Sequence, residues 1–221
     1  MYGDYYFDMG AGTCHDAHLL QEAGLNCIPF EPYFSPEGEQ VPCLESSRAL
    51  NSAFLDALEN CPQGKPSSIV SSFVLNSIPH HKDRMAYLAI LASMCKIDTI
   101  VYAGTQSTKI LKYGSIDHQL RMNTSEPNMT LGNNSKLFKA QKYYTETEIR
   151  KMFSTFFMDI SIKKAENQIY IKASKPKRIK ASLLREALLL EFELPFANGE
   201  TLGLGQRALE VFSKHTGMDL S

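Results

Sequence analysis

The chain has no apolar run that approaches the ~20 residues needed for a membrane-spanning helix, which argues against a membrane protein. Its amino-terminal sequence, MYGDYYFDMG, lacks the basic and apolar segments of a signal peptide, so no secretory leader is predicted. The five cysteines are scattered and contain no C-x-x-C pair, so neither a disulfide framework nor a zinc site is indicated. Together these absences predict a cytoplasmic protein that holds no metal.

Basic residues are scarce in the first half of the chain and in excess in the second. Residues 1–100 contain 5 Lys and Arg against 12 Asp and Glu, whereas residues 101–221 contain 18 against 12. The densest basic stretch comprises Lys163, Lys164, Lys172, Lys175, Lys177, Arg178, Lys180 and Arg185. Such a cluster can attract nucleic acid through phosphate contacts and counterion release, or it can be a solvated surface. Both interpretations stay open.

The apolar patterns alternate between strand and helix, in an order typical of an α/β domain. The expected strands are residues 5–9, 26–30, 68–75, 98–103, 157–162 and 168–173, with a very short additional strand near 40–43. The expected helices are residues 14–24, 46–58, 83–94, 145–153, 180–191 and 205–215. Residues 106–140 are expected to be irregular. Thr145 and Glu148 have the spacing of a capping box, which begins a helix.

The most informative motif joins the first two strands. Asp8-Met9-Gly10-Ala11-Gly12-Thr13 follows the first strand, and Glu31 ends the second. Glycines allow a sharp turn and close approach of the backbone to a ligand. A carboxylate at the second strand end can accept hydrogen bonds from two ribose hydroxyls, and the ~20-residue offset from the turn is typical of nucleoside sites. The motif therefore predicts a nucleoside-binding βαβ unit.

The same turn distinguishes between two nucleoside ligands. A dinucleotide-binding dehydrogenase would favour G-x-G-x-x-G, but His15 occupies the third glycine position. The carboxylate of Asp8 would repel a pyrophosphate, whereas it suits a ligand that ends in a zwitterionic amino acid. The turn therefore favours S-adenosylmethionine over a nicotinamide dinucleotide.

On these residues the chain resembles class I S-adenosylmethionine-dependent methyltransferases. Residues 71–79 (SSFVLNSIP) are similar to the fourth strand and the following loop of that family, and residues 157–173 resemble its final antiparallel hairpin. More narrowly, FEPYFSP (30–36), FVLN (73–76) and FKAQKYYTETE (138–148) are similar to bacterial methyltransferase-like proteins found with DNA phosphorothioation and other mobile or defence loci.

The resemblance implies a Rossmann-like, seven-stranded, mostly parallel sheet with an antiparallel terminal strand and a carboxyl-terminal helical extension. Residues 1–175 would bind S-adenosylmethionine, and residues 176–221 would form the extension. The implied cofactor-binding residues are Asp8, Gly10, Ala11, Gly12, Thr13, Glu31, Pro32, Ser71, Ser72 and Phe73. Asn76 and Pro79 would face the substrate. Residues 76–79 share only the Asn and the final Pro with the N-P-P-Y motif of amino-methyltransferases and lack its stacking aromatic, so a strand-end cap is the preferred interpretation of Asn76.

Two departures from the family pattern bear on function. Asp8 lies only seven positions after Met1, so either a cover for the cofactor comes from elsewhere, such as the carboxyl-terminal helices, or the pocket is open and its affinity is low. Cys14 stands where many members have a third glycine. The leading hypothesis is methyl transfer to nucleic acid, which the basic second half favours, or to a small molecule. The alternative is a non-catalytic subunit of the same fold that binds nucleic acid or a protein partner.

Several other features have more than one interpretation. His80 and His81 beside Asp83 could act as a base or metal ligands, but a solvent-facing loop explains them better. Tyr143 and Tyr144, near Lys139 and Lys142, resemble the aromatic and basic lining of a nucleic-acid groove or the approach to a helix. The apolar stretch 185–192 predicts either core packing or an oligomer contact through the carboxyl-terminal helices.

Overall fold

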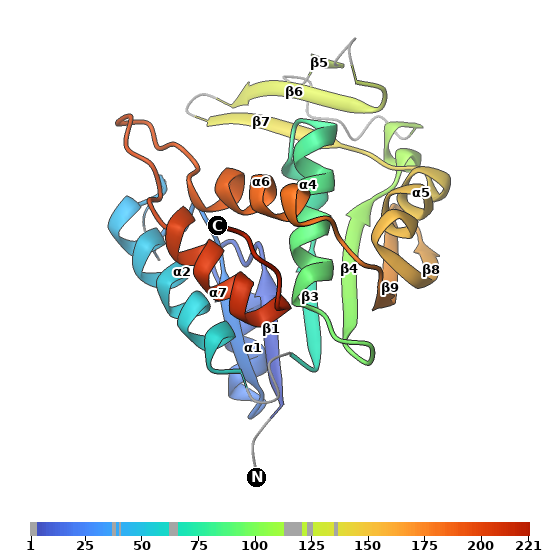
Figure 1. Cartoon of the computed structure of the whole chain (residues 1–221). Coiled ribbons are helices and arrows are strands. Elements are labelled where there is room, and N and C mark those ends of the chain that lie inside the picture. Colours follow the sequence, from blue (N-terminus) through green and yellow to red (C-terminus); the bar gives the residue numbers. More distant parts are fainter. Residues whose placement is uncertain are drawn as a thin grey trace.

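Six strands form the central sheet of the computed structural model, which describes residues 4–36, 39, 41–61, 66–112, 121–122, 126–134 and 137–221 (Figure 1). The strand order is β2-β1-β3-β4-β9-β8. These strands are β1 (Tyr5–Met9), β2 (Asn26–Phe30), β3 (Ser68–Ser72), β4 (Ile100–Gln106), β8 (Phe157–Ala165) and β9 (Gln168–Pro176). Only β9 runs antiparallel to its neighbours, β4 and β8. The predicted mostly parallel sheet with an antiparallel terminal strand is confirmed.

The predicted seventh strand is absent from this sheet in the described residues. Gln40 lies outside them, and the chain from Val41 to Cys43 is not a strand. Proline lacks an N–H donor, so Pro36 and Pro42 disfavour a sheet ladder in this segment. The amide of Cys43 instead donates to the carbonyl of Phe34 at 3.0 Å, which closes a loop. Consequently β2 leads directly through this loop to the next helix.

Helices cover the two faces of the sheet unequally. They are α1 (His15–Glu22), α2 (Leu44–Glu59), α3 (Val74–Ser77), α4 (His81–Met94), α5 (Glu146–Phe156), α6 (Ala181–Phe192) and α7 (Gly205–Thr216). The helix α1 packs on β1 and β2 over a small cluster of its own, whereas α2, α4, α5, α6 and α7 share the main core on the opposite face (Figure 1). None of the helices in the described ranges is long and apolar enough to cross a membrane.

Two segments differ from the sequence prediction. The strand expected over 68–75 ends at Ser72, because Phe73 adopts a left-handed conformation (φ 60°) and α3 follows. The segment expected to be irregular contains a short helix, η2 (Thr108–Lys112), and a small antiparallel sheet of β5 (Arg121–Met122), β6 (Met129–Asn134) and β7 (Leu137–Lys142). This small sheet lies beyond the carboxyl ends of the parallel strands (Figure 1). The predicted capping box of Thr145 and Glu148 is confirmed at the start of α5.

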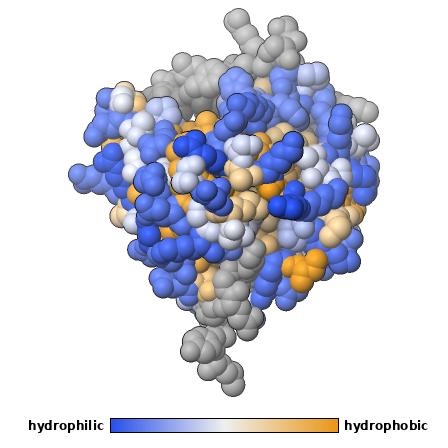
Figure 2. Space-filling view, viewed as in Figure 1, coloured by the Kyte–Doolittle hydropathy of each residue, from blue (hydrophilic) through white to orange (hydrophobic). Residues whose placement is uncertain are grey.

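The two carboxyl-terminal helices pack on the sheet through a group of phenylalanines. Phe192 is fully buried, and its ring centroid lies 5.2 Å from that of Phe30 and 6.3 Å from that of Phe212. On the surface, Lys214 of α7 pairs with Glu59 of α2 at 2.5 Å. The view of this side in Figure 2 is largely hydrophilic, with apolar residues in small groups. Leu188, in the predicted apolar stretch, is fully buried and belongs to the main core.

Candidate functional site

The glycine turn is anchored to the end of β2 by backbone hydrogen bonds. The amides of Gly10 and Ala11 both donate to the carbonyl of Phe30, at 2.8 and 2.9 Å. Gly10 has a φ of +76°, and a Cβ there would lie 2.3 Å from a methyl carbon of Val74. Gly12 has a φ of +56° and open space where its Cβ would be. The backbone conformation therefore favours glycine at both positions, but only at Gly10 would a Cβ also clash with a neighbouring side chain.

Glu31 lies across this turn. Its Oε2 accepts the amide N–H of Gly12 at 2.9 Å, and its Oε1 accepts that of Tyr33 at 3.0 Å. The buried side chain of Asn51 fixes the Glu31 backbone, since its amide group accepts from the N–H at 3.0 Å and donates to the carbonyl at 2.8 Å. Burial raises the pKa of Glu31, and the two N–H donors partly oppose that rise.

A cavity of about 630 Å³ opens beside the turn, within the size range of small-molecule sites. Its lining comes from the turn, the ends of β2 and β3, the α3–α4 segment, and α6 with the residues after it. The residues are Gly10, Gly12, Glu31, Pro32, Tyr33, Ser72, Phe73, Val74, Ser77, Ile78, Pro79, Asp83, Tyr87, Leu190, Glu191, Leu194 and Pro195. Both halves of the chain thus contribute to one site.

The charged groups of this cavity are all acidic. Glu31, Asp83 and Glu191 line it, and no Lys or Arg of the described ranges does. Burial, together with the nearby charges of Glu31 and Asp83, raises the pKa of Glu191 to about 7. Like charges held close together without a counterion destabilise their ionised forms. The cavity is therefore electrostatically suited to a cation and unsuited to an anionic pyrophosphate.

The segment that follows α6 forms a cover over one end of the cavity. Tyr33, after β2, donates its hydroxyl to the carbonyl of Pro195 at 3.0 Å, and its ring lies 5.3 Å from that of Phe196. Leu190 and Leu194 line the same side of the cavity. Of the carboxyl-terminal extension, the end of α6 and the residues that follow it thus lie where a cover is expected.

Seven of the predicted site residues line the cavity, and five do not. Those in the lining are Gly10, Gly12, Glu31, Pro32, Ser72, Phe73 and Pro79. Those outside it are Asp8, Ala11, Thr13, Ser71 and Asn76. Three of the five, Asp8, Ser71 and Asn76, are buried polar residues, and their hydrogen bonds show why they do not line the cavity.

Asp8 points away from the cavity, into the small core beneath α1. It is 2% exposed, one carboxylate oxygen has no hydrogen-bond partner in the described structure, and the amide of Ala17 donates to the carboxylate. Burial, with the neighbouring charges of Asp16 and Glu31, raises the pKa of Asp8 to about 6. The prediction that Asp8 lies against a ligand is corrected: Asp8 supports the start of α1 beneath the turn.

Ser71 and Asn76 are also corrected from ligand contacts to supporting residues. The hydroxyl of Ser71 lies 2.7 Å from that of Tyr87, which donates to the Met9 carbonyl at 3.0 Å. The amide of Asn76 donates to the Lys142 carbonyl at 3.2 Å and accepts from the Thr105 hydroxyl at 2.6 Å. Both side chains are buried and engaged, so neither faces the substrate side.

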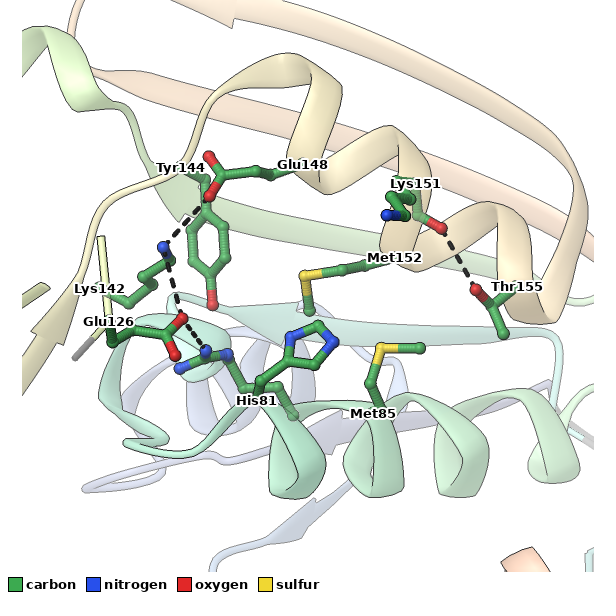
Figure 3. Close-up of a pocket in the computed structure, with 10 residues that line it drawn as sticks. His81, Met85, Glu126, Lys142, Tyr144, Glu148, Lys151, Met152 and Thr155 are labelled. Carbon is green, nitrogen blue, oxygen red and sulfur yellow. Dashed lines mark hydrogen bonds and ion pairs between the residues drawn. The ribbon is translucent and has the colours of Figure 1, made fainter. Parts of the chain in front are cut away.

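A second cavity of about 230 Å³ lies between α4, α5 and the end of β7, and contains an ion cluster of two buried basic and two partly exposed acidic side chains (Figure 3). Arg84, fully buried, pairs with Glu126 at 2.5 Å and donates to the carbonyls of Ile78 and Pro79 at 2.8 and 3.0 Å. Lys142 pairs with Glu148 at 3.2 Å, as Figure 3 shows. Because Ile78 and Pro79 line the first cavity, this cluster fixes one of its walls.

Several residues of the site lie outside the sequence-based prediction. Tyr87, Asp83 and Glu191 lie within segments whose apolar periodicity predicts only helices. Tyr33 lies in a proline-rich loop, where no pattern assigns a direction to a side chain. A signal for Asp83 and Tyr87 existed, because their spacing of four places both on one helix face. His80 is exposed, and His81 lies in the second cavity.

Comparison with known proteins bears on the fold. No protein-family model matches the sequence, and no curated protein matches it significantly. Among solved structures, the PH0226 protein of Pyrococcus horikoshii matches with a TM-score of 0.55 at 10% identity, over 79% of this chain and 82% of its own. An S-adenosylmethionine-dependent methyltransferase from Methanosarcina mazei matches with a TM-score of 0.51 at 11% identity, over 79% of this chain and 93% of its own. The fold is that of the S-adenosylmethionine-dependent methyltransferases.

A third structure agrees with this methyltransferase fold. The S-adenosylmethionine-dependent methyltransferase from Clostridium acetobutylicum matches with a TM-score of 0.50 at 13% identity, over 79% of this chain and 84% of its own. The predicted class I methyltransferase fold is thus confirmed, with six strands described in place of seven. The comparisons contain nothing on phosphorothioation or defence loci, so that association stays a prediction.

Proposed function

We propose that the chain binds S-adenosylmethionine in the cavity beside the glycine turn and transfers its methyl group to an acceptor. The observation that carries this proposal is the charge of the cavity. Three carboxylates and no described Lys or Arg line it, next to a turn and strand-end carboxylate of the nucleoside-binding type. A cationic nucleoside fits this environment, whereas a dinucleotide would bring a pyrophosphate against it.

The residues present fit the parts of such a ligand. Each oxygen of Glu31 accepts one backbone N–H and retains capacity for another donor, so the pair can accept two ribose hydroxyls. Pro32 and the ring of Tyr33 offer flat apolar surface for a base on the same side. The open space over Gly12 leaves the backbone accessible to a close polar contact.

When bound, S-adenosylmethionine supplies an electrophilic methyl group on a sulfonium. The chain's contribution is binding and orientation, because methyl transfer requires in-line placement of the acceptor and a suitably polar pocket. Ser72 and Phe73 form one wall, and Ser77, Ile78 and Pro79 form the adjoining wall. Asp83 and Glu191 favour the positive charge electrostatically. No described residue is assigned as a general base.

Isothermal titration with S-adenosylmethionine, S-adenosylhomocysteine and NADH tests this proposal. We expect micromolar binding of the first two, about −8 kcal/mol, and no binding of NADH. Glu31→Ala should weaken binding far more than it lowers the melting temperature, whereas Glu22→Ala on the exposed side of α1 should change neither.

The outcomes separate the two functions that the sequence leaves open. Binding followed by transfer of labelled methyl to a nucleic acid or small molecule supports the enzyme. A well-folded chain that binds neither adenosyl ligand would refute the proposal, and the non-catalytic subunit would then take its place. Preferential binding of NADH would point instead to an oxidoreductase.

A further inference from the structure

One face of the sheet formed by β4, β9 and β8 carries two partly exposed tyrosines. On β4, β9 and β8 the side chains that alternate with Ala103, Ile171 and Ile162 point away from α4 and α5. Tyr102 and Tyr170 lie on this outer face and are 45% and 43% exposed. No helix of the described ranges packs over them. Two aromatic rings that are partly exposed on one sheet face offer flat surfaces on which a planar group can stack.

Each of these tyrosines is paired across strands with a lysine. Tyr102 lies directly opposite Lys172, whose amino nitrogen is 5.9 Å from the centre of the tyrosine ring. Tyr170 lies directly opposite Lys163 on β8. Because Gly104 is the residue opposite Tyr170, the two rings are diagonal neighbours on adjacent strands, ~7–8 Å apart at the backbone. The face thus repeats an aromatic and cationic pair at close spacing.

This outer face is continuous with the wall of the first cavity. Gly104 shares the face with Tyr102, and the nearest atoms to a Cβ built there belong to the ring of Phe73, at 3.7 Å. The Phe73 ring therefore lies over Gly104, on the side where Tyr170 is the cross-strand neighbour. Phe73 also lines the cavity beside the glycine turn. A chain laid over the two tyrosines would thus lead toward Phe73 and the part of the cavity that Phe73 lines.

We propose that this face, defined by Tyr102, Tyr170, Lys163 and Lys172, binds single-stranded nucleic acid. Successive bases stack on the two tyrosine rings, and the two lysines contact the phosphates between them. Stacking on exposed aromatics combined with basic side chains is the general chemistry of single-strand binding. Delivery of a base to the cavity, which would make the strand the methyl acceptor, additionally rests on the proposed function.

Other basic residues of the predicted cluster form ion pairs elsewhere or lie away from the tyrosine face. Lys164 pairs with Glu146 at 2.8 Å, and Lys175 pairs with Asp159 at 2.6 Å. The second pair also offsets the charge of Asp159, which shares the outer face of β8 with Lys163. Arg178 and Lys180 precede α6, which packs on α4 on the opposite side of the sheet. Lys163 and Lys172 are thus the cations that the structure directs onto the tyrosine face.

Fluorescence anisotropy with a labelled 12-nucleotide oligo(dT) or oligo(U), in the absence of any adenosyl ligand, tests the proposal. We expect the wild-type chain to bind the single strand and to bind a duplex of equal length more weakly. Tyr102→Ala and Tyr170→Ala should each weaken binding about tenfold, and the corresponding Phe variants should retain it, because the stacking ring is kept. Lys163→Glu with Lys172→Glu should abolish binding, whereas Arg178→Glu with Lys180→Glu, an equal change of charge, should preserve it.

Adenosyl-ligand titration of the same variants separates this proposal from the preceding one. All of them should bind S-adenosylmethionine as the wild type does, since none of the substituted residues lines the cavity. The proposal would be overturned if the wild type did not bind the single strand or bound a duplex equally well. It would also be overturned if the double variant Tyr102→Ala with Tyr170→Ala bound the single strand as the wild type does. A homodimer that the double alanine variant dissociates would also overturn it, since the face would then be a protein contact.

Discussion

The amide of Gly12 donates to Oε2 of Glu31 at 2.9 Å, which joins the turn after β1 to the end of β2. The second oxygen of the same carboxylate accepts from Tyr33. The side chain of Glu31 is thus oriented by the protein itself, and a ligand that uses it does not have to order it. Such orientation before binding reduces the entropic cost of association.

Asn51 supports this arrangement from below, and its removal should be costly. Its side chain makes hydrogen bonds to the Glu31 N–H and carbonyl and to the Ser47 carbonyl, all in a buried setting. Asn51→Ala should lower the free energy of unfolding by about 2–3 kcal/mol, because buried backbone groups lose their partners. Urea denaturation measures this. Asn60→Ala, which removes an exposed hydrogen bond at the end of the same helix, should cost less than about 1 kcal/mol.

The two glycines of the turn should respond differently to alanine. Gly10→Ala combines a left-handed backbone with a clash against Val74, and we expect a loss of about 2–4 kcal/mol. Gly12→Ala meets no atom within 4 Å and should lose only the conformational term, about 1 kcal/mol. Gly24→Ala, at a similar φ with no neighbour within 4 Å, is the control for that term. Equal losses at Gly10 and Gly12 would contradict the steric argument.

Asp8 should make folding stability depend on pH. Its pKa is raised from 3.8 to about 6 by burial, so the native state favours the protonated form. The associated stability is fully present below the unfolded pKa and is lost as the pH rises through about 6, a change of about 3 kcal/mol. Asp8→Asn should therefore be more stable than the wild type at pH 8 and flatten the profile between pH 4 and 6. Asp4→Asn, at an exposed position, should leave the profile unchanged.

Glu191 should make the discrimination between charged and neutral ligands depend on pH. With a pKa of about 7, its carboxyl becomes ionised as the pH rises through neutrality. Affinity for S-adenosylmethionine, whose sulfonium is positive, should therefore increase relative to S-adenosylhomocysteine between pH 6 and 8. Titration calorimetry at several pH values gives this ratio. Glu191→Gln should make the affinity ratio less dependent on pH. Glu186 is an exposed residue of the same helix, so Glu186→Gln should leave the pH dependence of the ratio unchanged.

The fold could be predicted to the extent that it depends on local patterns. The strand at Asn26–Phe30 and the capping box at Thr145 follow from apolar alternation and from a three-residue spacing, and both are found. The break after Ser72 could not be predicted, because the left-handed conformation of Phe73 is imposed by tertiary packing rather than by its own preference. The hairpin of β6 and β7 was hidden by polar residues on a small sheet beside the main core.

The candidate site divides along the same line. Gly10, Gly12 and Glu31 belong to one βαβ unit with a fixed spacing, so the sequence alone indicates their proximity. Glu191 reaches the same cavity from a helix 160 positions beyond Glu31, and no local pattern connects them. The sequence predicts a ligand contact for Asp8 only because a carboxylate there suits a zwitterionic ligand. The alternation of side chains along β1 instead directs it to the opposite face.

The cover formed by residues 190–195 has a consequence for the order in which the site is made during synthesis. The turn, the strand-end carboxylate and the α4 wall leave the ribosome first. The cover is translated more than 90 residues after Tyr87, the last of the earlier lining residues. It also follows β9 in the chain, and β9 lies between β4 and β8 in the sheet. The cavity is therefore complete only after the end of α6 and the residues that follow it have been made and have docked.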